Sequence, residues 1–380
     1  MNESCRCWAE VDLDALRENL AWLRLRAGAG VKLLTVVKAD AYGHGLKQIA
    51  ALLMQSGTDI FGVANLAEAE AVRAVGRGWP VLMLGACLPH EIEAAVRDDV
   101  MPTLSTLAEA RSFSRAAVAQ GKRVKVHLKV DTGMGRLGVP AEEALPLLHR
   151  ITRLPGLQVH GLFTHYSAVE DDRVFSRRQN QRFLDLVASL RAAGRPIELV
   201  HALNSGALLL ERGTTFNAVR PGLLVYGIVP PGARRVPPAL RKHLRPALAW
   251  KCHVSLVKTV PPGTPLSYGH TFTTAKKMRV ATLTAGYGDG YLRAGSNRAQ
   301  VLIRGHRCRI LGRITMDQMI ADVSRVPGVR PGDEVVLIGR QGRAQITATE
   351  LAHWFGTIPW EVLTNINHRV RRIYRGSHAA

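Results

Sequence analysis

Several kinds of residue are scarce in this chain of 380 residues. It has five cysteines, 6% aromatic residues, and only 30 acidic side chains against 51 lysines and arginines. So few cysteines argue against a disulfide scaffold and fit a reducing compartment, so we expect a cytoplasmic protein. Cys5 and Cys7 form a CxC pair without a second pair, which argues against a zinc site, and we expect no metal.

Long apolar segments are also missing. No apolar run approaches the roughly 20 residues that a membrane-spanning helix needs. The first part of the chain carries Glu3, Arg6, Glu10 and Asp12, and this charge is incompatible with the apolar core of a signal peptide. We therefore expect no association with a membrane.

The shortage of acidic residues gives a formal net charge of +21 and an isoelectric point near 10.5. A nucleic-acid-binding protein can have such a composition. However, the basic residues are spread along the chain, without a Lys/Arg run or a basic tail. Attraction of anionic small molecules, phosphates included, is the milder interpretation. Nucleic-acid binding on charge alone is therefore kept only as a distant alternative, and no nucleic-acid partner is expected.

Short apolar runs alternate with helical segments through the first part of the chain. Helical spacing is clear at Leu13, Leu16, Leu20 and Leu23. The apolar runs cover residues 32–39, 59–65, 80–85, 101–105, 124–131, 159–166, 197–204 and 217–227. Alternating strands and helices predict parallel βαβ units, and eight units in about 230 residues match a (β/α)8 barrel. A doubly wound sheet is the alternative, but the chain has no GxGxxG motif.

The alternation stops near residue 230. Residues 229–240, VPPGARRVPPAL, are rich in proline and predict a linker. Short strands punctuated by glycine and proline follow, with one helix near Ala348–Phe355. We therefore expect a TIM-type (β/α)8 barrel over residues 1–238 and a mostly antiparallel β domain over residues 239–380.

Polar residues stand where the predicted barrel strands end, which is where barrel enzymes carry their active sites. Lys38 ends the first strand, Arg136 closes the turn after the fifth, and His165 ends the sixth. Ser205 follows the seventh strand and Arg220 follows the eighth. Each has an ordinary explanation alone, such as a solvated charge or a helix cap. Their convergence on one rim predicts an active site.

Lys38 has two valines before it and small or aromatic neighbours after it. A desolvated lysine loses proton affinity and becomes an amine nucleophile. At a barrel mouth this suggests a Schiff base with an aldehyde, and pyridoxal phosphate is the common cofactor of that kind. Ser205 and the backbone N–H groups near Gly222 and Leu223 could cradle the phosphate at a helix N-terminus, and Tyr42 could add a hydroxyl.

Eight motifs, taken together, resemble those of alanine racemases in order and spacing, and the resemblance runs from about Trp8 to Ile373. They are VVKADAYGHG, KVDTGMGRLG, GLFTHYSA, LNSGALL, VRPGLLVYG, LSYGHTF, AGYGDGYLR and GRITMDQM. The resemblance implies a two-base racemisation of L-alanine and D-alanine with pyridoxal 5'-phosphate, which supplies D-alanine for peptidoglycan. It also implies a homodimer whose active site is shared between the subunits.

The resemblance assigns the catalytic roles. Lys38 would hold the cofactor and act as one base, while Tyr268 of the other subunit would be the opposing base. His165 would link Tyr268 to Arg220, and Arg220 would face the pyridine nitrogen. Because arginine is a donor only, that nitrogen would stay unprotonated and the cofactor would be a weaker electron sink.

The resemblance also assigns the binding residues. Arg136 would contact the substrate, and the backbone N–H of Met316 from the partner chain would bind its carboxylate. Lys129 matches a lysine that is carbamylated in some members, with an ion pair to a nearby acid as the alternative. The cofactor phosphate would be held by Tyr42, Ser205, Gly222, Leu223 and the residue at position 360.

The chain departs from the family pattern in three places. Trp360 stands where the family usually has a tyrosine, Thr315 precedes Met316, and the three acids 170–172 replace a single acidic gate residue. A broader amino-acid racemase, acting on serine for instance, therefore stays open. A decarboxylase of the same architecture is disfavoured, because such an enzyme would pair the pyridine nitrogen with an acid instead of Arg220. The long β domain excludes a single-domain cofactor carrier.

Overall fold

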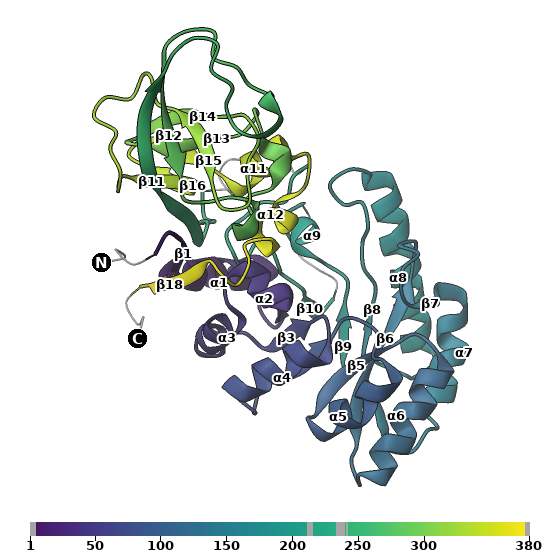
Figure 1. Cartoon of the computed structure of the whole chain (residues 1–380). Helices are drawn as coiled ribbons and strands as arrows, with labels where there is room; N and C mark the ends of the chain where they lie inside the picture. Colours follow the sequence, from purple (N-terminus) through teal and green to yellow (C-terminus); the bar gives the residue numbers. More distant parts are fainter. Residues whose placement is uncertain (1–4, 211–215, 233–239, 241, 377–380) are drawn as a thin grey trace. The chain divides into compact units, whose positions relative to one another are not determined.

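The computed structural model describes residues 5–210, 216–232, 240 and 242–376, and contacts between residues divide the chain into two compact units. The barrel unit comprises Arg17–Ala41 and Gly45–Arg245. The sheet unit comprises Met1–Leu16, Tyr42–His44 and Pro246–Ala380. Figure 1 shows the elements of both units in chain order.

Eight parallel strands form the barrel unit. They are β2 (Lys32–Val36), β3 (Ile60–Val63), β4 (Val81–Met83), β5 (Val100–Leu104), β6 (Val124–Asp131), β8 (Leu157–Phe163), β9 (Leu199–His201) and β10 (Ala218–Val219). Each pairs with the next in parallel, and β10 pairs with β2, which closes the barrel. Short β7 (Val139–Pro140) adds to β6. The expected barrel is confirmed, and each strand lies within or next to its predicted run.

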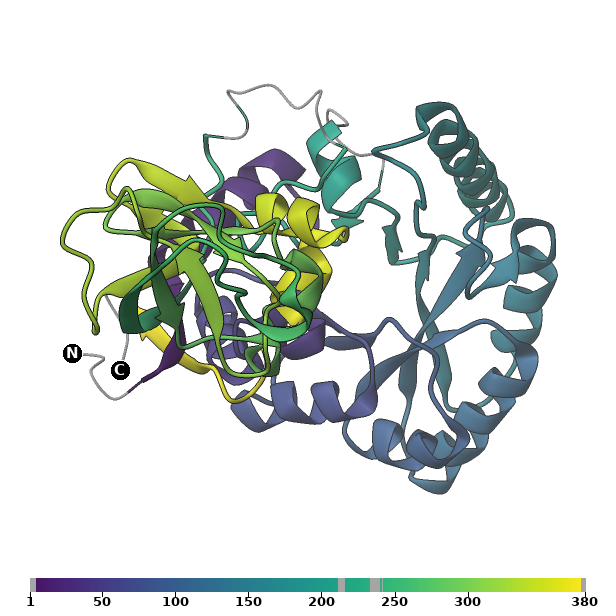
Figure 2. The ribbon, with the colours of Figure 1, turned by 45° about the horizontal axis from the view of Figure 1, so that its top comes forward.

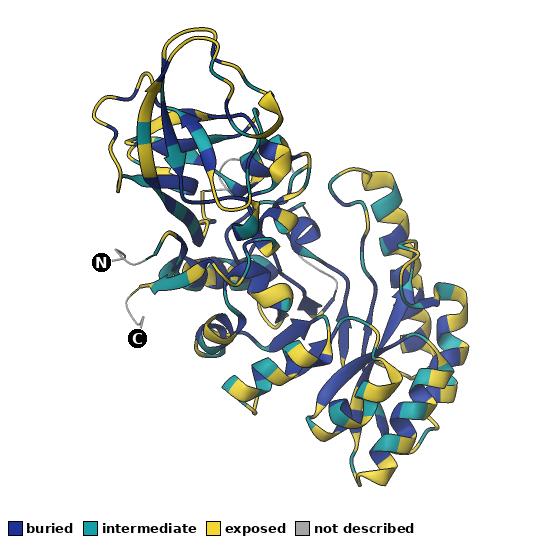
Figure 3. Cartoon of the chain, viewed as in Figure 1, coloured by how far each residue is buried: buried dark blue, intermediate teal, exposed yellow. Residues whose placement is uncertain are grey.

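Helices cover the outside of these strands (Figure 2). They bury one apolar face and expose the other, so the strands are dark and the outer helix faces bright in Figure 3. Local signals fix several helix starts: Asn65 caps α4, and Thr106 with Glu109 forms a capping box on α6. In chain order the helices are α1 (Leu13–Ala27), α2 (Lys38–Gly43), α3 (Leu46–Gln55), α4 (Leu66–Val75), α5 (Ile92–Arg97), α6 (Leu107–Ala119), α7 (Ala141–Ile151), α8 (Arg173–Ala192) and α9 (Ser205–Leu210).

The sheet unit contains a second nine-stranded sheet, mostly antiparallel as expected, in the order β17-β16-β13-β14-β15-β12-β11-β1-β18. The predicted helix is found as α11 (Ala348–Phe355), followed by α12 (Pro359–Thr364). The strands after the barrel are β11 (Leu248–Val260), β12 (Met278–Leu283), β13 (Gln300–Ile303), β14 (His306–Leu311), β15 (Met319–Asp322), β16 (Glu334–Gln341) and β17 (Ala344–Ile346).

The two ends of the chain also enter this second sheet. Strand β1 (Cys7–Asp12) pairs antiparallel with β11 and parallel with β18 (Arg371–Arg375). Sequence reasoning assigned the first residues to the barrel, because a six-residue strand carries no local sign of a partner more than 230 residues away. Of the predicted linker 229–240, residues 233–239 lie outside the described part of the chain.

Some gross features can be stated for the described residues. None of their helices is both long and apolar enough to cross a membrane. The five cysteines form no disulfide. The same residues contain no group of three or more His, Cys, Asp or Glu side chains arranged to hold a metal ion.

Candidate active site

The end of the first barrel strand is fixed to the neighbouring strand ends. The Val36 N–H donates to the Pro221 carbonyl at 2.9 Å, and the Val37 N–H donates to the Gly62 carbonyl at 2.9 Å. The buried hydroxyl of Tyr226 donates to the Val36 carbonyl at 3.1 Å. Lys38 therefore starts from a rigid point at the C-terminal ends of the strands.

Directly after this point the backbone forms a left-handed turn. Residues Ala39–Tyr42 have φ angles between 52° and 55°, a conformation that costs about 1–2 kcal/mol for each residue with a side chain. Glu68 helps to hold it, because its carboxylate accepts from the N–H groups of Ala39 and Ala64, both at 2.7 Å. Sequence reasoning missed this turn and the role of Glu68, since propensities give almost no weight to consecutive left-handed residues.

The environment of Lys38 lowers the proton affinity of its amine. Burial lowers its pKa, the positive charge of Arg136 lowers it further, and the carboxylate of Glu68 acts in the opposite direction. The net direction is downward, as the apolar sequence context predicts. A lysine in this state can attack a carbonyl carbon or accept a proton.

Arg136 stands at the end of a turn that Asp131 organises. The Asp131 carboxylate accepts hydrogen bonds from the N–H groups of Gly133, Met134 and Gly135 at 2.8–2.9 Å. Burial works to raise the pKa of Asp131, but these three bonds hold it below its usual range. Asp131 is therefore an anchor for the turn, and it leaves Arg136 exposed at the rim.

Arg220 is buried among neutral acceptors. Its guanidinium donates to the carbonyls of Thr164 and Ala202 at 2.7 and 2.8 Å, to His201 Nδ1 at 2.7 Å and to His165 Nδ1 at 3.3 Å. Burial lowers its pKa to about 10. No carboxylate of the described residues forms an ion pair with it. The sequence indicated His165 as a partner but gave no sign of the other three.

His165 is held as a neutral imidazole by this arrangement. Because Arg220 can only donate, His165 Nδ1 must accept, and the ring proton is on Nε2. Burial and then the charges of Arg220, Lys129, Arg136 and Lys38 lower the pKa of His165 well below its usual value. The Nε2–H group is thus available as a hydrogen-bond donor.

Lys129 adds a further amine to the same cluster. Burial, followed by the charges of Arg220 and Arg136, lowers its pKa to about 7. Its Nζ lies 5.0 Å from the centroid of the Phe163 ring. No described carboxylate lies within ion-pair distance of Lys129, although the charge of the nearby Asp131 acts to raise its pKa. An uncharged amine is the form that a carbamate requires.

The predicted phosphate cradle is a compact turn. Ser205 Oγ accepts from the N–H groups of Gly222 at 2.9 Å and of Leu224 at 3.4 Å. The Leu223 N–H has no acceptor among the described residues. Asn204 caps the following helix by accepting from the Ala207 N–H at 3.0 Å. Hydroxyl and amide donors thus converge after the ends of the neighbouring strands β9 and β10, as an anionic group requires.

The three acids after His165 have different positions. Asp172 caps α8 by accepting from the Phe175 N–H at 2.9 Å. Glu170 packs so closely on the start of α9 that a side chain at Gly206 would lie 2.0 Å from its Oε1 atom. Burial raises the pKa of Glu170. Of the three acids, Glu170 is therefore the one against the predicted cradle.

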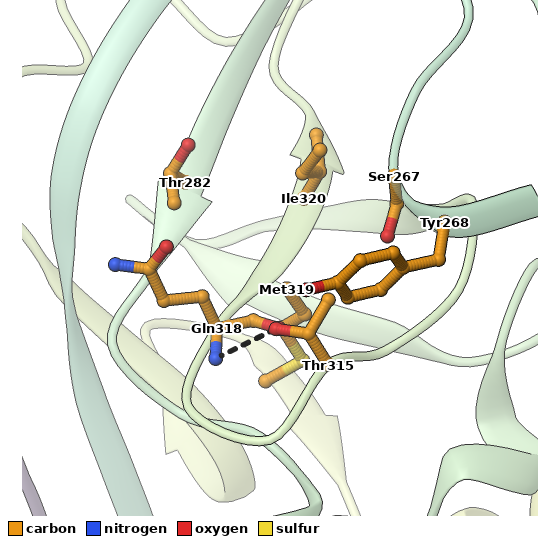
Figure 4. Close-up of a pocket in the computed structure, with 7 residues that line it drawn as sticks. All are labelled: Ser267, Tyr268, Thr282, Thr315, Gln318, Met319 and Ile320. Carbon is orange, nitrogen blue, oxygen red and sulfur yellow. Dashed lines mark hydrogen bonds between the residues drawn. The ribbon is translucent and has the colours of Figure 1, made fainter.

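The remaining predicted residues, Tyr42, Tyr268, Met316 and Trp360, belong to the sheet unit. Tyr268 is 71% exposed and Met316 is 53% exposed. Figure 4 shows the Tyr268 ring over a pocket of about 450 Å³, which is lined by Ser267, Tyr268, Thr282, Thr315, Gln318, Met319 and Ile320.

The turn that carries Tyr268 is rigid although its ring is exposed. Ser267 has a φ of 63°, and its hydroxyl donates to the Arg313 carbonyl at 2.5 Å. Gly269 lies so close to the Arg313 guanidinium that an added Cβ would be 2.8 Å from it. The Tyr268 ring thus projects from a fixed backbone, and the Arg313 guanidinium lies beside the same turn at Gly269.

The backbone around Met316 presents a donor. The Tyr287 N–H donates to the Thr315 carbonyl at 3.0 Å, and the Gly288 N–H donates to the Met316 carbonyl at 2.8 Å. The Thr315 N–H donates to the Gln318 carbonyl at 3.0 Å. The Met316 N–H has no acceptor among the described residues, so it can bind an external carboxylate.

Tyr42 and Trp360 are placed more deeply in this unit. Tyr42 is buried, and its carbonyl lies 2.9 Å from His44 Nδ1. Arg372 donates to the neighbouring Gly43 carbonyl at 3.0 Å, and a Cβ at Gly43 would be 2.2 Å from a backbone oxygen of α12. Trp360 lies on α12 and is half-buried.

The fold and the site together define a class. A (β/α)8 barrel carries a desolvated lysine amine, basic side chains and convergent N–H donors at the C-terminal ends of its strands, and the chain has a separate β domain. This is the architecture of a barrel enzyme with a lysine amine among its candidate site residues.

Comparison with known proteins specifies the family. Residues 11–230 match the alanine racemase N-terminal domain and residues 247–374 match the alanine racemase C-terminal domain. The alanine racemase of Symbiobacterium thermophilum is 43% identical over 374 residues, 98% of each chain. The chain belongs to the alanine racemase family.

Solved structures agree with this assignment. The alanine racemase from D-cycloserine-producing Streptomyces lavendulae has a TM-score of 0.91 and 35% identity, covering 98% of this chain and 97% of its own. The alanine racemase from Bartonella henselae, solved with covalently bound pyridoxal phosphate, has a TM-score of 0.87 and 27% identity, covering 98% of this chain and 100% of its own.

Proposed function

We propose that the protein interconverts L-alanine and D-alanine with pyridoxal 5'-phosphate by a two-base mechanism in a homodimer. The reaction supplies D-alanine for peptidoglycan in the cytoplasm. The observation that carries the proposal is the burial of Arg220, a donor-only side chain, among neutral acceptors at the rim that holds Lys38. A carboxylate in that place would favour a decarboxylase.

The residues present fit this cofactor. Lys38 offers an amine of lowered pKa for covalent attachment. Ser205 and the Leu223 N–H offer donors for the phosphate, and the surrounding cations favour a dianion. Arg220 offers a donor for the pyridine nitrogen and keeps that nitrogen unprotonated. When bound, the cofactor supplies the electron withdrawal that acidifies the α-hydrogen of the amino acid.

The two bases divide the proton transfer between the faces of the α-carbon. Lys38 removes or returns the proton on one face, and its lowered pKa reduces the cost of having the amine unprotonated. Tyr268 serves the other face, entering from the partner subunit with its exposed hydroxyl. His165 donates through Nε2–H to that hydroxyl and so favours its ionised form. The Met316 N–H and Arg136 hold the substrate carboxylate.

A racemase of broader specificity is the second candidate. Trp360 replaces the family's usual tyrosine, and it offers only an indole N–H instead of a hydroxyl. The size of the entrance near Trp360 and Met316 decides whether a serine side chain is accepted. Parallel assays with alanine and serine separate the two candidates.

The first experiment is an absorbance spectrum of the purified protein, before and after borohydride, followed by incubation with L-alanine in deuterated water. The expected result is a near-visible band that borohydride abolishes, a label on Lys38, and loss of optical activity with deuterium at the α-carbon. The Lys38→Ala variant is the control and should show neither band nor label. A wild-type protein without any band after added cofactor contradicts the proposal.

A further inference from the structure

Behind Arg220, three histidines extend the hydrogen bonds of its guanidinium. Arg220 Nη1 lies 2.7 Å from His201 Nδ1, and His201 Nε2 lies 3.0 Å from His127 Nδ1. His127 Nε2 lies 2.9 Å from His160 Nδ1, and His160 Nε2 lies 3.3 Å from a carboxylate oxygen of Glu198. The five side chains form one continuous series of hydrogen bonds.

The end groups set the direction of every bond in this chain. Arg220 can only donate, so His201 Nδ1 accepts and its proton is on Nε2. That proton is donated to His127 Nδ1, and the same logic places the protons of His127 and His160 on Nε2. The last of them is donated to Glu198, a carboxylate that can only accept. All bonds therefore run from the guanidinium to the carboxylate.

This series of hydrogen-bonded side chains connects the two ends of the barrel. Arg220 follows β10 at the C-terminal ends of the strands, whereas Glu198 precedes β9 at the N-terminal ends. His160 and Glu198 line a pocket of about 420 Å³ at those N-terminal ends, together with Lys32 and Lys125. The outer end of the chain is therefore open to solvent, while the inner end is at the predicted active site.

The barrel is shaped to hold this chain. Gly161 pairs with His127 across β6 and β8, and a Cβ at Gly161 would lie 2.2 Å from the His127 ring. Phe163 stacks on His201 with ring centroids 4.7 Å apart and an interplanar angle of 9°. Asn217 fixes the outer end, since its amide donates to the Glu198 carbonyl at 2.7 Å.

The charge state of the histidines agrees with the direction of the bonds. Burial lowers the pKa of His127 and His201 well below the usual value, and nearby cations including Arg220 lower it further. Burial also lowers the pKa of His160. The carboxylate of Glu198 acts to raise this pKa, and the charges of Lys125 and Lys32 act to lower it. Neutral imidazoles can each accept at one nitrogen and donate at the other.

We propose that His201, His127, His160 and Glu198, together called the histidine relay, position and polarise Arg220. Hydrogen bonds in series strengthen one another, so the carboxylate at the outer end draws positive charge away from the guanidinium without contacting it. The proposal rests on the proposed function, in which Arg220 faces the pyridine nitrogen. It makes a surface residue at the far end of the barrel a positioning residue for the reaction.

The direct test is nitrogen NMR of the holoenzyme with labelled histidine at neutral pH. We expect three neutral rings with the proton on Nε2, and His201 is assigned by its contact with Phe163. Glu198→Gln removes the charge but keeps an acceptor, and it should shift the resonances of all three rings, most for His160 and least for His201. Glu143→Gln, an exposed carboxylate on α7, is the matched control and should shift none.

A second readout is kinetic and spectroscopic. Loss of the outer hydrogen-bond partner of a metal-bound histidine typically lowers activity or metal affinity about 10–100-fold. A relay of three rings should transmit a smaller effect, so we expect E198Q to lower kcat about threefold and to leave KM unchanged. The absorbance band of the bound cofactor should shift with it, whereas E143Q should change neither. His160→Asn removes the donor to Glu198, so it should reproduce the effect of E198Q.

Two results would overturn the relay. One is a proton on Nδ1 of any of the three rings, and the other is an E198Q protein in which only His160 responds and kcat equals that of the wild type. Glu198 is on the surface, so the test does not depend on variants of buried histidines. The NMR readout needs no substrate, so a wild-type enzyme that fails to racemise alanine would contradict only the proposed function.

Discussion

The barrel unit and the sheet unit carry their functional groups in opposite ways. In the barrel unit, Arg220 is buried, and several neutral acceptors fix its guanidinium. In the sheet unit, Tyr268 and Met316 are mostly exposed, and only the backbone beneath them is fixed. The barrel unit therefore holds its charged groups in a buried hydrogen-bonded cluster, whereas the sheet unit exposes its groups on a rigid backbone.

The difference shows which part of the work each unit can do. Burial and the charge of the buried Arg220 lower the pKa of Lys129, while burial and the charge of the exposed Arg136 lower the pKa of Lys38. An exposed tyrosine on a fixed turn stays in contact with water unless another surface covers it. The predictions below test this division, from the largest expected effect to the smallest.

The largest effect is expected when each unit loses its proposed base. Lys38→Ala and Tyr268→Phe should each lower racemisation by about 10²–10⁴-fold, the range for a positioned acid or base. A mixture of the two inactive proteins, dissociated and reassociated, should recover activity, because a hybrid dimer has one site with both bases intact. Chiral chromatography of alanine before and after mixing measures the recovery.

The hybrid also has a clear negative outcome. If Lys38 and Tyr268 of the same chain formed each site, every site in the hybrid would lack one base and mixing would restore nothing. Tyr268→Phe alone offers a further check, because Lys38 should still exchange the α-hydrogen of one enantiomer with deuterium without inversion. Exchange in both enantiomers would contradict the two-base proposal.

The next effect concerns the fixed geometry of the barrel cluster. Arg220→Lys keeps the charge but replaces a planar fork by a single ammonium, so it leaves buried acceptors such as the Thr164 carbonyl unmatched. We expect a loss of about 2 kcal/mol in the free energy of unfolding. Urea unfolding measures it, with Arg136→Lys, at an exposed site, as a control that should keep wild-type stability.

Lys129 should give a pH-dependent effect with a defined sign. Its pKa is about 7 in the folded state and 10.5 ordinarily, so the folded state bears the full cost of a buried charge below about pH 7. As the pH rises from 7 towards 10, the folded lysine is neutral while the unfolded one stays charged, and this cost disappears. Lys129→Met should therefore stabilise the protein most at low pH.

The measurement for Lys129 is urea unfolding across this pH range in bicarbonate-free buffer. Lys125→Met on the same strand is the matched control, because its side chain is exposed. A difference between Lys129→Met and wild type that is constant with pH, or that grows as the pH rises, would show that the amine is not desolvated in the folded state.

The smallest effect is expected at the departure from the family pattern in the sheet unit. Trp360→Tyr restores a hydroxyl, and one neutral hydrogen bond of about 1 kcal/mol corresponds to roughly fivefold tighter retention of the cofactor. Equilibrium dialysis measures it, and Trp360→Phe separates the hydroxyl from the change in size. Equal retention of the cofactor by the Tyr and Phe variants would show that a hydroxyl at position 360 makes no stabilising contact with the phosphate.

Much of the fold could be predicted from local pattern. The eight barrel strands coincide with apolar runs, and α11 has the predicted bounds Ala348–Phe355, because burial of a continuous strand and an amphipathic helix both leave a periodic trace. Strand β1 could not be predicted in its place, since its partners β11 and β18 are chosen by tertiary pairing. The same holds for the left-handed turn at Ala39–Tyr42, which contacts elsewhere in the fold must stabilise.

For the site, the sequence by itself determined the residue types and the strand ends at which they stand: a lysine after an apolar strand, and arginines and a histidine after others. Only the tertiary structure decided their state. Burial and neighbouring charges lower the pKa of Lys38 and Lys129, and His201 and two carbonyls fix Arg220. The physical reason is that desolvation and hydrogen-bond direction depend on groups that are distant in the sequence and adjacent only after the barrel closes.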